Sequence, residues 1–166
     1  MNALPILFAL NSFLIFFLVL IVGVLIYKSK PARLFDYAVM LVLTSGIAEV
    51  IKYFVNKPRP ESIYVFEGSG FPSTHSAVAA GVVFFYLLVC HSLPNTMKGV
   101  GEAIRINTYK RGGIVSFFII LTGLAVAWLR VLIGAHYPID VFAGIILGLS
   151  ISLVFVFYDI SGRRVR

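Results

Sequence analysis

The chain has 166 residues, of which 60% are hydrophobic and only 13% are charged, and its formal net charge is +7. A mean hydropathy of +0.98 excludes an ordinary soluble globular domain. The single cysteine, Cys90, excludes an internal disulfide and a cysteine metal cage. The basic residues flank apolar segments and are not interleaved with aromatics on one polar face, so the charge indicates a lipid bilayer as the partner and no nucleic acid.

Five stretches of the chain are apolar enough to cross a membrane, which takes about 20 residues in a helix. They cover residues 4–27, 34–55, 72–93, 114–135 and 140–158. The first has no basic n-region and is too long for a signal peptide, so we expect it to be retained. The pattern predicts an all-α, polytopic transmembrane bundle of about five spans. We expect one domain over residues 1–166, with its functional core at about 34–158.

Basic residues distinguish the two sides of this bundle. Most of them fall in three segments that an odd number of spans places on one side: Lys28, Lys30 and Arg33; Lys98, Arg105, Lys110 and Arg111; and Arg163, Arg164 and Arg166. By the positive-inside rule that side, with the C-terminus, is cytoplasmic. We therefore expect a multi-pass protein of the cell inner (plasma) membrane. Its 56–71 loop and 136–139 turn face the periplasm or the cell exterior.

Four basic residues are exceptions to this pattern and lie on the outer side: Lys52, Lys57, Arg59 and Arg130. A charge inside the end of a spanning helix costs at least about 3 kcal/mol unless it has a partner. The partner expected for four cations on one face is an anion. The open alternative is that they snorkel to the headgroups or pair with nearby glutamates, as Glu49 is expected to do with Lys52 one turn later.

The second stretch carries Lys52 near its end, and Arg59 follows after six intervening residues. The prolines on both sides of Arg59 predict that the helix stops near Asn56 and that the chain bends, which brings Arg59 back over the bundle. An ammonium and a guanidinium fork at different heights can hold different oxygens of one phosphoryl group.

The third stretch begins with Pro72, Ser73, Thr74 and His75. Proline suits the first position of a helix, and the free amides that follow it would form an anion site at the helix N-terminus. For Ser73, the alternative is a plain N-cap.

Arg130, His136 and Asp140 surround the turn between the fourth and fifth stretches. We expect Asp140 to accept a hydrogen bond from Nδ1 of His136, which leaves Nε2 as a nucleophile. The alternative is that Asp140 caps the fifth helix and that His136 is an interfacial histidine.

Together these residues can support phosphoryl transfer. His136 would attack phosphorus, and His75 would protonate the leaving oxygen and then activate water. The charge on the equatorial oxygens would be stabilised by Lys52, Arg59, Arg130 and the amides of Ser73 and Thr74. The outer side carries no tight carboxylate cluster, so we expect no metal and no other cofactor.

The motifs Lys52-x6-Arg59-Pro60, Pro72-Ser73-Thr74-His75 and Arg130-x5-His136-x3-Asp140 closely resemble the three signatures of the type 2 phosphatidic-acid phosphatase superfamily. That superfamily also includes bacterial lipid phosphatases and vanadium haloperoxidases. The motifs occur in family order and with family spacing. The resemblance implies a metal-independent phosphohistidine mechanism with His136 as nucleophile, His75 as general acid and Asp140 orienting His136. It implies phosphate binding by Lys52, Arg59, Ser73 and Arg130.

The chain departs from the family pattern in two positions and in its span count. Thr74 stands where the family usually has glycine, and Leu129 where it often has serine. Family members commonly have six spans with the motifs on the last four, whereas here one span precedes those four.

Three function classes are consistent with these residues: hydrolysis of a lipid phosphate or pyrophosphate, phosphotransfer to another lipid, and binding or transport of an anionic lipid. The polar groups cluster at one end of the bundle, which argues against a conduit. Phosphatidylglycerophosphate, phosphatidate, undecaprenyl pyrophosphate and lipid A 1-phosphate all fit a site at headgroup depth, and the 61–71 loop could act as a lid. Gly144 and Gly148 form a small-xxx-small pair, which predicts close helix packing.

Overall fold

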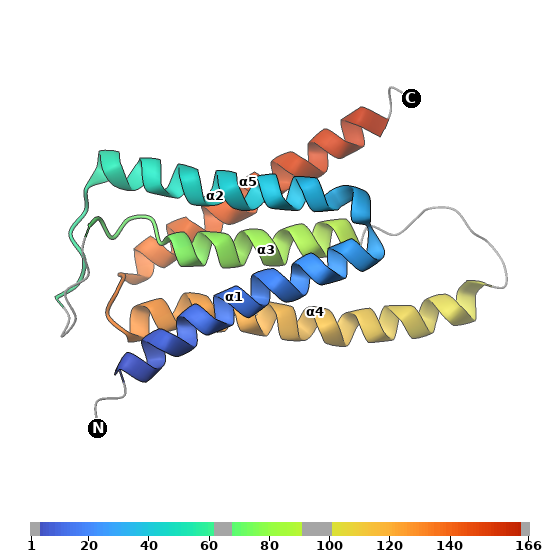
Figure 1. The fold of residues 1–166 in the computed structure, drawn as a ribbon, viewed down its shortest axis with the longest axis horizontal. Helices are drawn as coiled ribbons and strands as arrows, with labels where there is room; N and C mark the ends of the chain where they lie inside the picture. The colour runs from blue at the N-terminus through green and yellow to red at the C-terminus, as the bar shows by residue number, and fades with distance from the viewer. Residues whose placement is uncertain (1–3, 62–67, 91–100, 164–166) are drawn as a thin grey trace.

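The computed structural model describes residues 4–61, 68–90 and 101–163. The long helices of these residues run back and forth as a bundle (Figure 1). They are α1 (Leu4–Ser29), α2 (Leu34–Val55), α3 (Thr74–Cys90), α4 (Gly101–Leu132) and α5 (Pro138–Arg163), and a short 3-10 helix, η1 (Pro31–Arg33), joins α1 to α2. The predicted all-α bundle is confirmed. The bounds of α2 are those predicted, whereas α4 begins well before the predicted residue 114.

Within the described residues, four helices are long and apolar enough to cross a membrane: Leu4–Ser29, Pro31–Val55, Gly113–Leu132 and Pro138–Phe155. The apolar part of α3, Thr74–Val89, is shorter than the other four. α3 contacts all four other helices and packs most extensively against α5. Because its neighbours surround it, α3 does not have to match the thickness of the hydrocarbon layer by itself.

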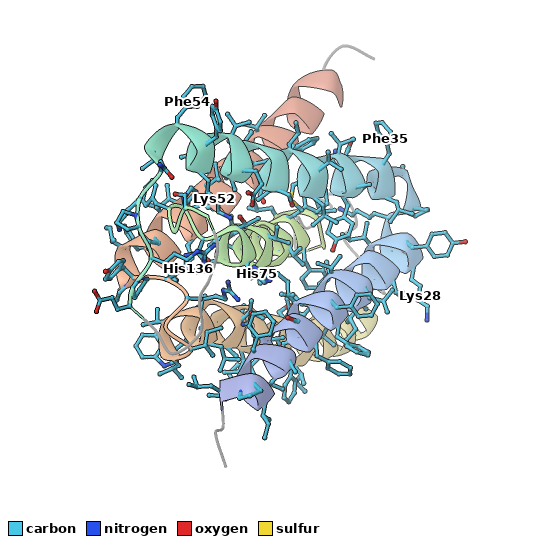
Figure 2. The ribbon with its side chains drawn as sticks, turned by 60° about the vertical axis from the view of Figure 1, so that its left-hand side comes forward. Lys28, Phe35, Lys52, Phe54, His75 and His136 are labelled. Carbon is cyan, nitrogen blue, oxygen red and sulfur yellow. The ribbon has the colours of Figure 1, made fainter. Side chains whose placement is uncertain are left out.

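The outer surface of the bundle is apolar. Val42, Phe35 and Phe54 are 71%, 76% and 79% exposed on α2 alone, and Figure 2 shows Phe35 and Phe54 pointing away from the other helices. Inside, apolar side chains such as Met40 and Phe85 are fully buried. Large apolar side chains on the outside of such a bundle indicate a lipid solvent, so the fold is that of a multi-pass membrane protein.

Glycines bring α3 and α5 into backbone contact. A Cβ atom built on Gly148 would lie 2.1 Å from the carbonyl oxygen of Ala77, and one on Gly144 would lie 2.5 Å from that of Ser73. The predicted close packing of this glycine pair is therefore confirmed. It also allows the amide of Ser73 to donate to the backbone carbonyl of Asp140 at 2.9 Å, which ties the beginning of α3 to the first turn of α5.

The up-and-down order places four polar helix ends together. The left end of the bundle in Figure 1 contains the C-terminal ends of α2 and α4. The N-terminal ends of α3 and α5 lie at the same end. η1, which follows Lys30 and ends in Arg33, lies at the opposite end. All three motifs are thus gathered at one end of the molecule.

Candidate active site

His136 lies at the centre of this polar end and is only 2% exposed. Its Nε2 atom is 3.4 Å from Nη1 of Arg59 and 3.4 Å from Nη2 of Arg130. Its Nδ1 atom is 2.6 Å from the carbonyl oxygen of Gly70. Because a carbonyl oxygen only accepts, Nδ1 carries the proton and Nε2 presents its lone pair between the two guanidinium groups.

The protonation state of His136 follows from these surroundings. Burial, followed by the positive charge of Arg130, lowers its pKa to about 3, and the hydrogen bond to Gly70 opposes this shift without overcoming it. At neutral pH, well above that pKa, the imidazole is therefore uncharged. A neutral imidazole with a lone pair on Nε2 is the form that can act as a nucleophile.

The predicted hydrogen bond between Asp140 and His136 is wrong. The carbonyl of Gly70 occupies Nδ1 of His136. The buried carboxylate of Asp140 instead accepts from Nζ of Lys57 at 2.5 Å and from the amide of Tyr137 at 2.9 Å. The physical reason is that α5 begins at Pro138, so Asp140 lies in its first turn and turns back to satisfy the amide that precedes the helix. The alternative role, capping α5, describes its contacts.

Lys57 belongs to the site, although the sequence motifs gave it no role of its own. Its ammonium group lies 4.9 Å from the ring centroid of Tyr137 as well as against Asp140. Its backbone carbonyl accepts from the amide of Gly70 at 2.8 Å, and its amide donates to Oγ of Ser69 at 3.0 Å. Lys57 therefore holds the Gly70 segment, and with it the acceptor for His136, against the beginning of α5.

Arg59 bends back over the bundle, as its flanking prolines predict. α2 ends at Val55, and Asn56 follows in the left-handed conformation with φ 43°. Nη1 of Arg59 donates to the carbonyl of Ala135 at 3.0 Å and Nε donates to that of Gly68 at 3.1 Å. Burial lowers the pKa of Arg59 from its ordinary value, yet a guanidinium remains charged at neutral pH.

Arg130 is 5% exposed, and its Nε and Nη1 atoms are buried with no hydrogen-bond partner among the described residues. An unpaired buried guanidinium is costly unless an anion satisfies its donors. Nη2 of the same side chain faces His136. The unsatisfied donors thus lie beside the unprotonated imidazole nitrogen, where an oxyanion would bind.

The second motif, Pro72-Ser73-Thr74-His75, does not present all the free backbone amides that we predicted. Ser73 is fully buried, its amide is engaged by Asp140, and its Oγ accepts from the hydroxyl of Ser76 at 2.9 Å. The prediction of a free amide on Ser73 is therefore wrong, and its contacts are those of an N-cap for α3, which begins at Thr74. His75 follows in the first turn, half-buried, and Figure 2 shows it at the same end of the bundle as His136.

Lys52 pairs with Glu49, as predicted from their spacing, at 2.8 Å between Nζ and Oε1. The hydroxyl of Thr74 donates to the same carboxylate oxygen at 2.8 Å. An open pocket of about 480 Å³ adjoins this pair, lined by Glu49, Lys52, Tyr53, Asn56, Arg59, Gly68 and Ser69. Arg59 links this pocket to His136, because it lines the pocket and contacts the imidazole.

Comparison with known proteins identifies a family for this chain. The family model of the PAP2 superfamily matches residues 33–164. A probable sphingosine-1-phosphate phosphatase of Dictyostelium discoideum is 31% identical over 121 residues, which are 69% of this chain and 28% of that protein. The chain therefore spans little more than a quarter of the length of this curated relative.

The fold also matches a solved structure. A transmembrane PAP2 type phosphatidylglycerolphosphate phosphatase from Bacillus subtilis superposes with a TM-score of 0.69 at 23% sequence identity, over 99% of this chain and 78% of the other. The family model covers most of the chain and includes all three motifs. The chain therefore belongs to the PAP2 superfamily, the type 2 phosphatidic-acid phosphatase family that its motifs resemble.

Proposed function

We propose that this protein is a membrane phosphatase that hydrolyses a lipid phosphomonoester through a phosphohistidine at His136. The observation that carries the proposal is the pairing of two unsatisfied donors on buried Arg130 with the unprotonated Nε2 of His136. The guanidinium requires an anion and the imidazole is a nucleophile, and Nη2 of Arg130 lies 3.4 Å from Nε2 of His136. A phosphoryl group bound there is positioned for attack.

In the first step, Nε2 of His136 attacks phosphorus and the bond to the leaving alcohol oxygen breaks. The negative charge of the bound phosphate favours the protonated form of His75, which donates its proton to that oxygen, so the alcohol leaves neutral. Arg59 and Arg130 stabilise the charge on the equatorial oxygens. The carbonyl of Gly70 keeps the other imidazole nitrogen protonated, which favours the positive charge that the ring acquires as the P–N bond forms.

In the second step, water attacks phosphorus, the P–N bond breaks and inorganic phosphate leaves. His75, deprotonated in the first step, accepts the proton from water. The described residues contain no group of three or more His, Cys, Asp or Glu that could hold a metal ion. The donors gathered around His136 are cationic and suit phosphate oxygens directly, which supports chemistry without a metal.

The orientation that we propose places this site at the outer face of a plasma membrane. Lys28, Lys30 and Arg33 lie at the opposite end of the bundle, which supports a cytoplasmic location for that end. The site then lies at the depth of the outer headgroups, where a lipid phosphate can enter between helices while its tails remain in the hydrocarbon layer.

The names of the two similar proteins support a phosphomonoester as the substrate, since both refer to lipids that end in one. The direct test is phosphate release by the purified protein from phosphatidylglycerophosphate, sphingosine-1-phosphate, phosphatidate, undecaprenyl pyrophosphate and lipid A 1-phosphate, with and without EDTA. We expect release from at least one phosphomonoester and no loss in EDTA. Transfer to a second lipid without free phosphate would contradict hydrolysis, and abolition by EDTA would contradict the metal-independent mechanism.

A further inference from the structure

Glu49 is an acidic residue in a pocket that also contains two cationic side chains. It lines the same pocket as Lys52 and Arg59, which bind phosphate in the proposed function. A carboxylate in such a place repels a bound phosphate, so its presence needs a physical reason. The Glu49 side chain is 61% exposed, whereas that of Lys52 is only 14% exposed. Glu49 therefore opens toward the solvent of the pocket while its partner lies against the protein.

The hydrogen bonds of Glu49 leave half of its carboxylate available. Nζ of Lys52 and the hydroxyl of Thr74 both donate to Oε1. Within the described part of the chain, Oε2 receives no hydrogen bond from another residue. The Thr74 and Lys52 contacts fix the direction of the carboxylate, because they hold one oxygen from two helices. Oε2 can then accept a donor that enters the pocket.

Building on the proposed function, we propose that Glu49 selects lipid phosphates whose alcohol carries a hydroxyl or ammonium group close to the phosphate ester. A donor of this kind would bind Oε2 while the phosphate binds Lys52 and Arg59. The ammonium of Lys52 bridges the two sites, since it lies 2.8 Å from Oε1. That bridge limits the separation of donor and phosphate to a few covalent bonds.

Charge and lining both support this class of substrate. A hydrogen bond to an ionised carboxylate is about twice as strong as one between neutral groups, and a substrate without the donor cannot form it. A second anionic group at this position would meet the negative charge of Glu49. Tyr53 and Asn56 also line the pocket, so its wall offers further polar groups to a hydroxylated or aminated headgroup.

The test compares two substrates that differ in one hydroxyl. Lysophosphatidate has a free hydroxyl on the carbon next to the phosphate ester, and its 2-deoxy analogue with the same acyl chain lacks it. Both are presented in mixed detergent micelles, and the ratio of kcat/KM for the two is measured. We expect the unaltered protein to prefer lysophosphatidate by about tenfold or more. In Glu49→Ala the ratio should fall close to one.

Two further variants keep the test decisive. Asp36→Ala is the control. It removes an ion pair at the other end of α2, in which Nη1 of Arg33 lies 2.6 Å from Oδ2 of Asp36. This variant should keep the preference for lysophosphatidate. Glu49→Gln keeps an acceptor for Lys52 and Thr74 but loses the charge, so its ratio should be intermediate. If Glu49→Ala does not fold, the ratio measured for Glu49→Gln tests the proposal in its place.

Equal rates on both lipids in the unaltered protein would overturn the selection by Glu49 and leave the phosphatase function intact. An undiminished preference in the Glu49 variants would overturn it as well. Release from neither lipid, nor from any member of the phosphomonoester panel, would instead overturn the proposed function on which the selection rests.

Discussion

Replacement of His136 by alanine is expected to lower phosphate release by about 10⁴-fold or more, the scale of loss when a catalytic nucleophile is removed. The variant keeps Arg59 and Arg130, so lipid phosphate should still bind. The imidazole is buried and uncharged at neutral pH, with a pKa of about 3. Its removal therefore takes away an uncharged group that carries the proposed nucleophilic nitrogen, and it removes no charge from the site. The measurement is the initial rate of phosphate release at saturating lipid.

A matched control comes from the lipid-facing side of α4. Trp128 is 61% exposed and lies two residues before Arg130, so Trp128→Phe should keep the rate of the unaltered protein. A second control is the binding of a lipid phosphate to His136→Ala, measured by isothermal titration in detergent micelles. It separates a loss of chemistry from a loss of the binding site. A variant that retains more than a tenth of the rate would show that His136 is not the nucleophile.

Replacement of Gly148 by alanine is expected to destabilise the protein by about 3 kcal/mol, the upper part of the usual range for an overfilled core. The added Cβ would meet the backbone carbonyl of Ala77 at 2.1 Å and the amide of Gly81 at 2.6 Å. Backbone atoms cannot rotate away, so α3 and α5 must separate. Activity should fall as well, because separation shifts His75 on α3 relative to His136 before α5.

The control for this change is Gly46→Ala on α2, where a Cβ atom would meet nothing within 4 Å. There the substitution should be neutral or slightly stabilising, because alanine favours the helix more than glycine does. Thermal unfolding in detergent compares the two variants. Equal unfolding temperatures for Gly148→Ala and Gly46→Ala would contradict the close contact between α3 and α5.

The fold could be predicted largely from apolar run length and from a few local signals. α2 illustrates this, because Pro31 precedes its start and Lys57-Pro58 follow its end, and both observed bounds agree with the prediction. The gathering of Arg59 and Arg130 at His136 also followed from topology, since an up-and-down order places those helix ends together. The beginning of α4 lacked such a signal, because its first residues are polar.

The hydrogen bonds within the site could not be predicted in the same way. Nδ1 of His136 is held by a backbone carbonyl 66 positions away, and Asp140 by a lysine 83 positions away. Neither pair has a periodicity or a spacing rule, and a backbone carbonyl leaves no trace in the identity of its residue. Thr74 is the opposite case. It departs from the family glycine, and the structure supplies a reason, since its hydroxyl contacts Glu49.

The phosphohistidine is the central claim, and its direct measurement is the capture of the phosphorylated protein. The unaltered protein is mixed with a lipid phosphomonoester, quenched at alkaline pH within the first turnover, digested and analysed by mass spectrometry. We predict one phosphoryl group on His136, stable in alkali and lost in acid, and none in His136→Ala. Two results would contradict the mechanism. One is phosphate release in the same samples with the phosphoryl group on another residue. The other is phosphate release with no phosphorylated protein at all.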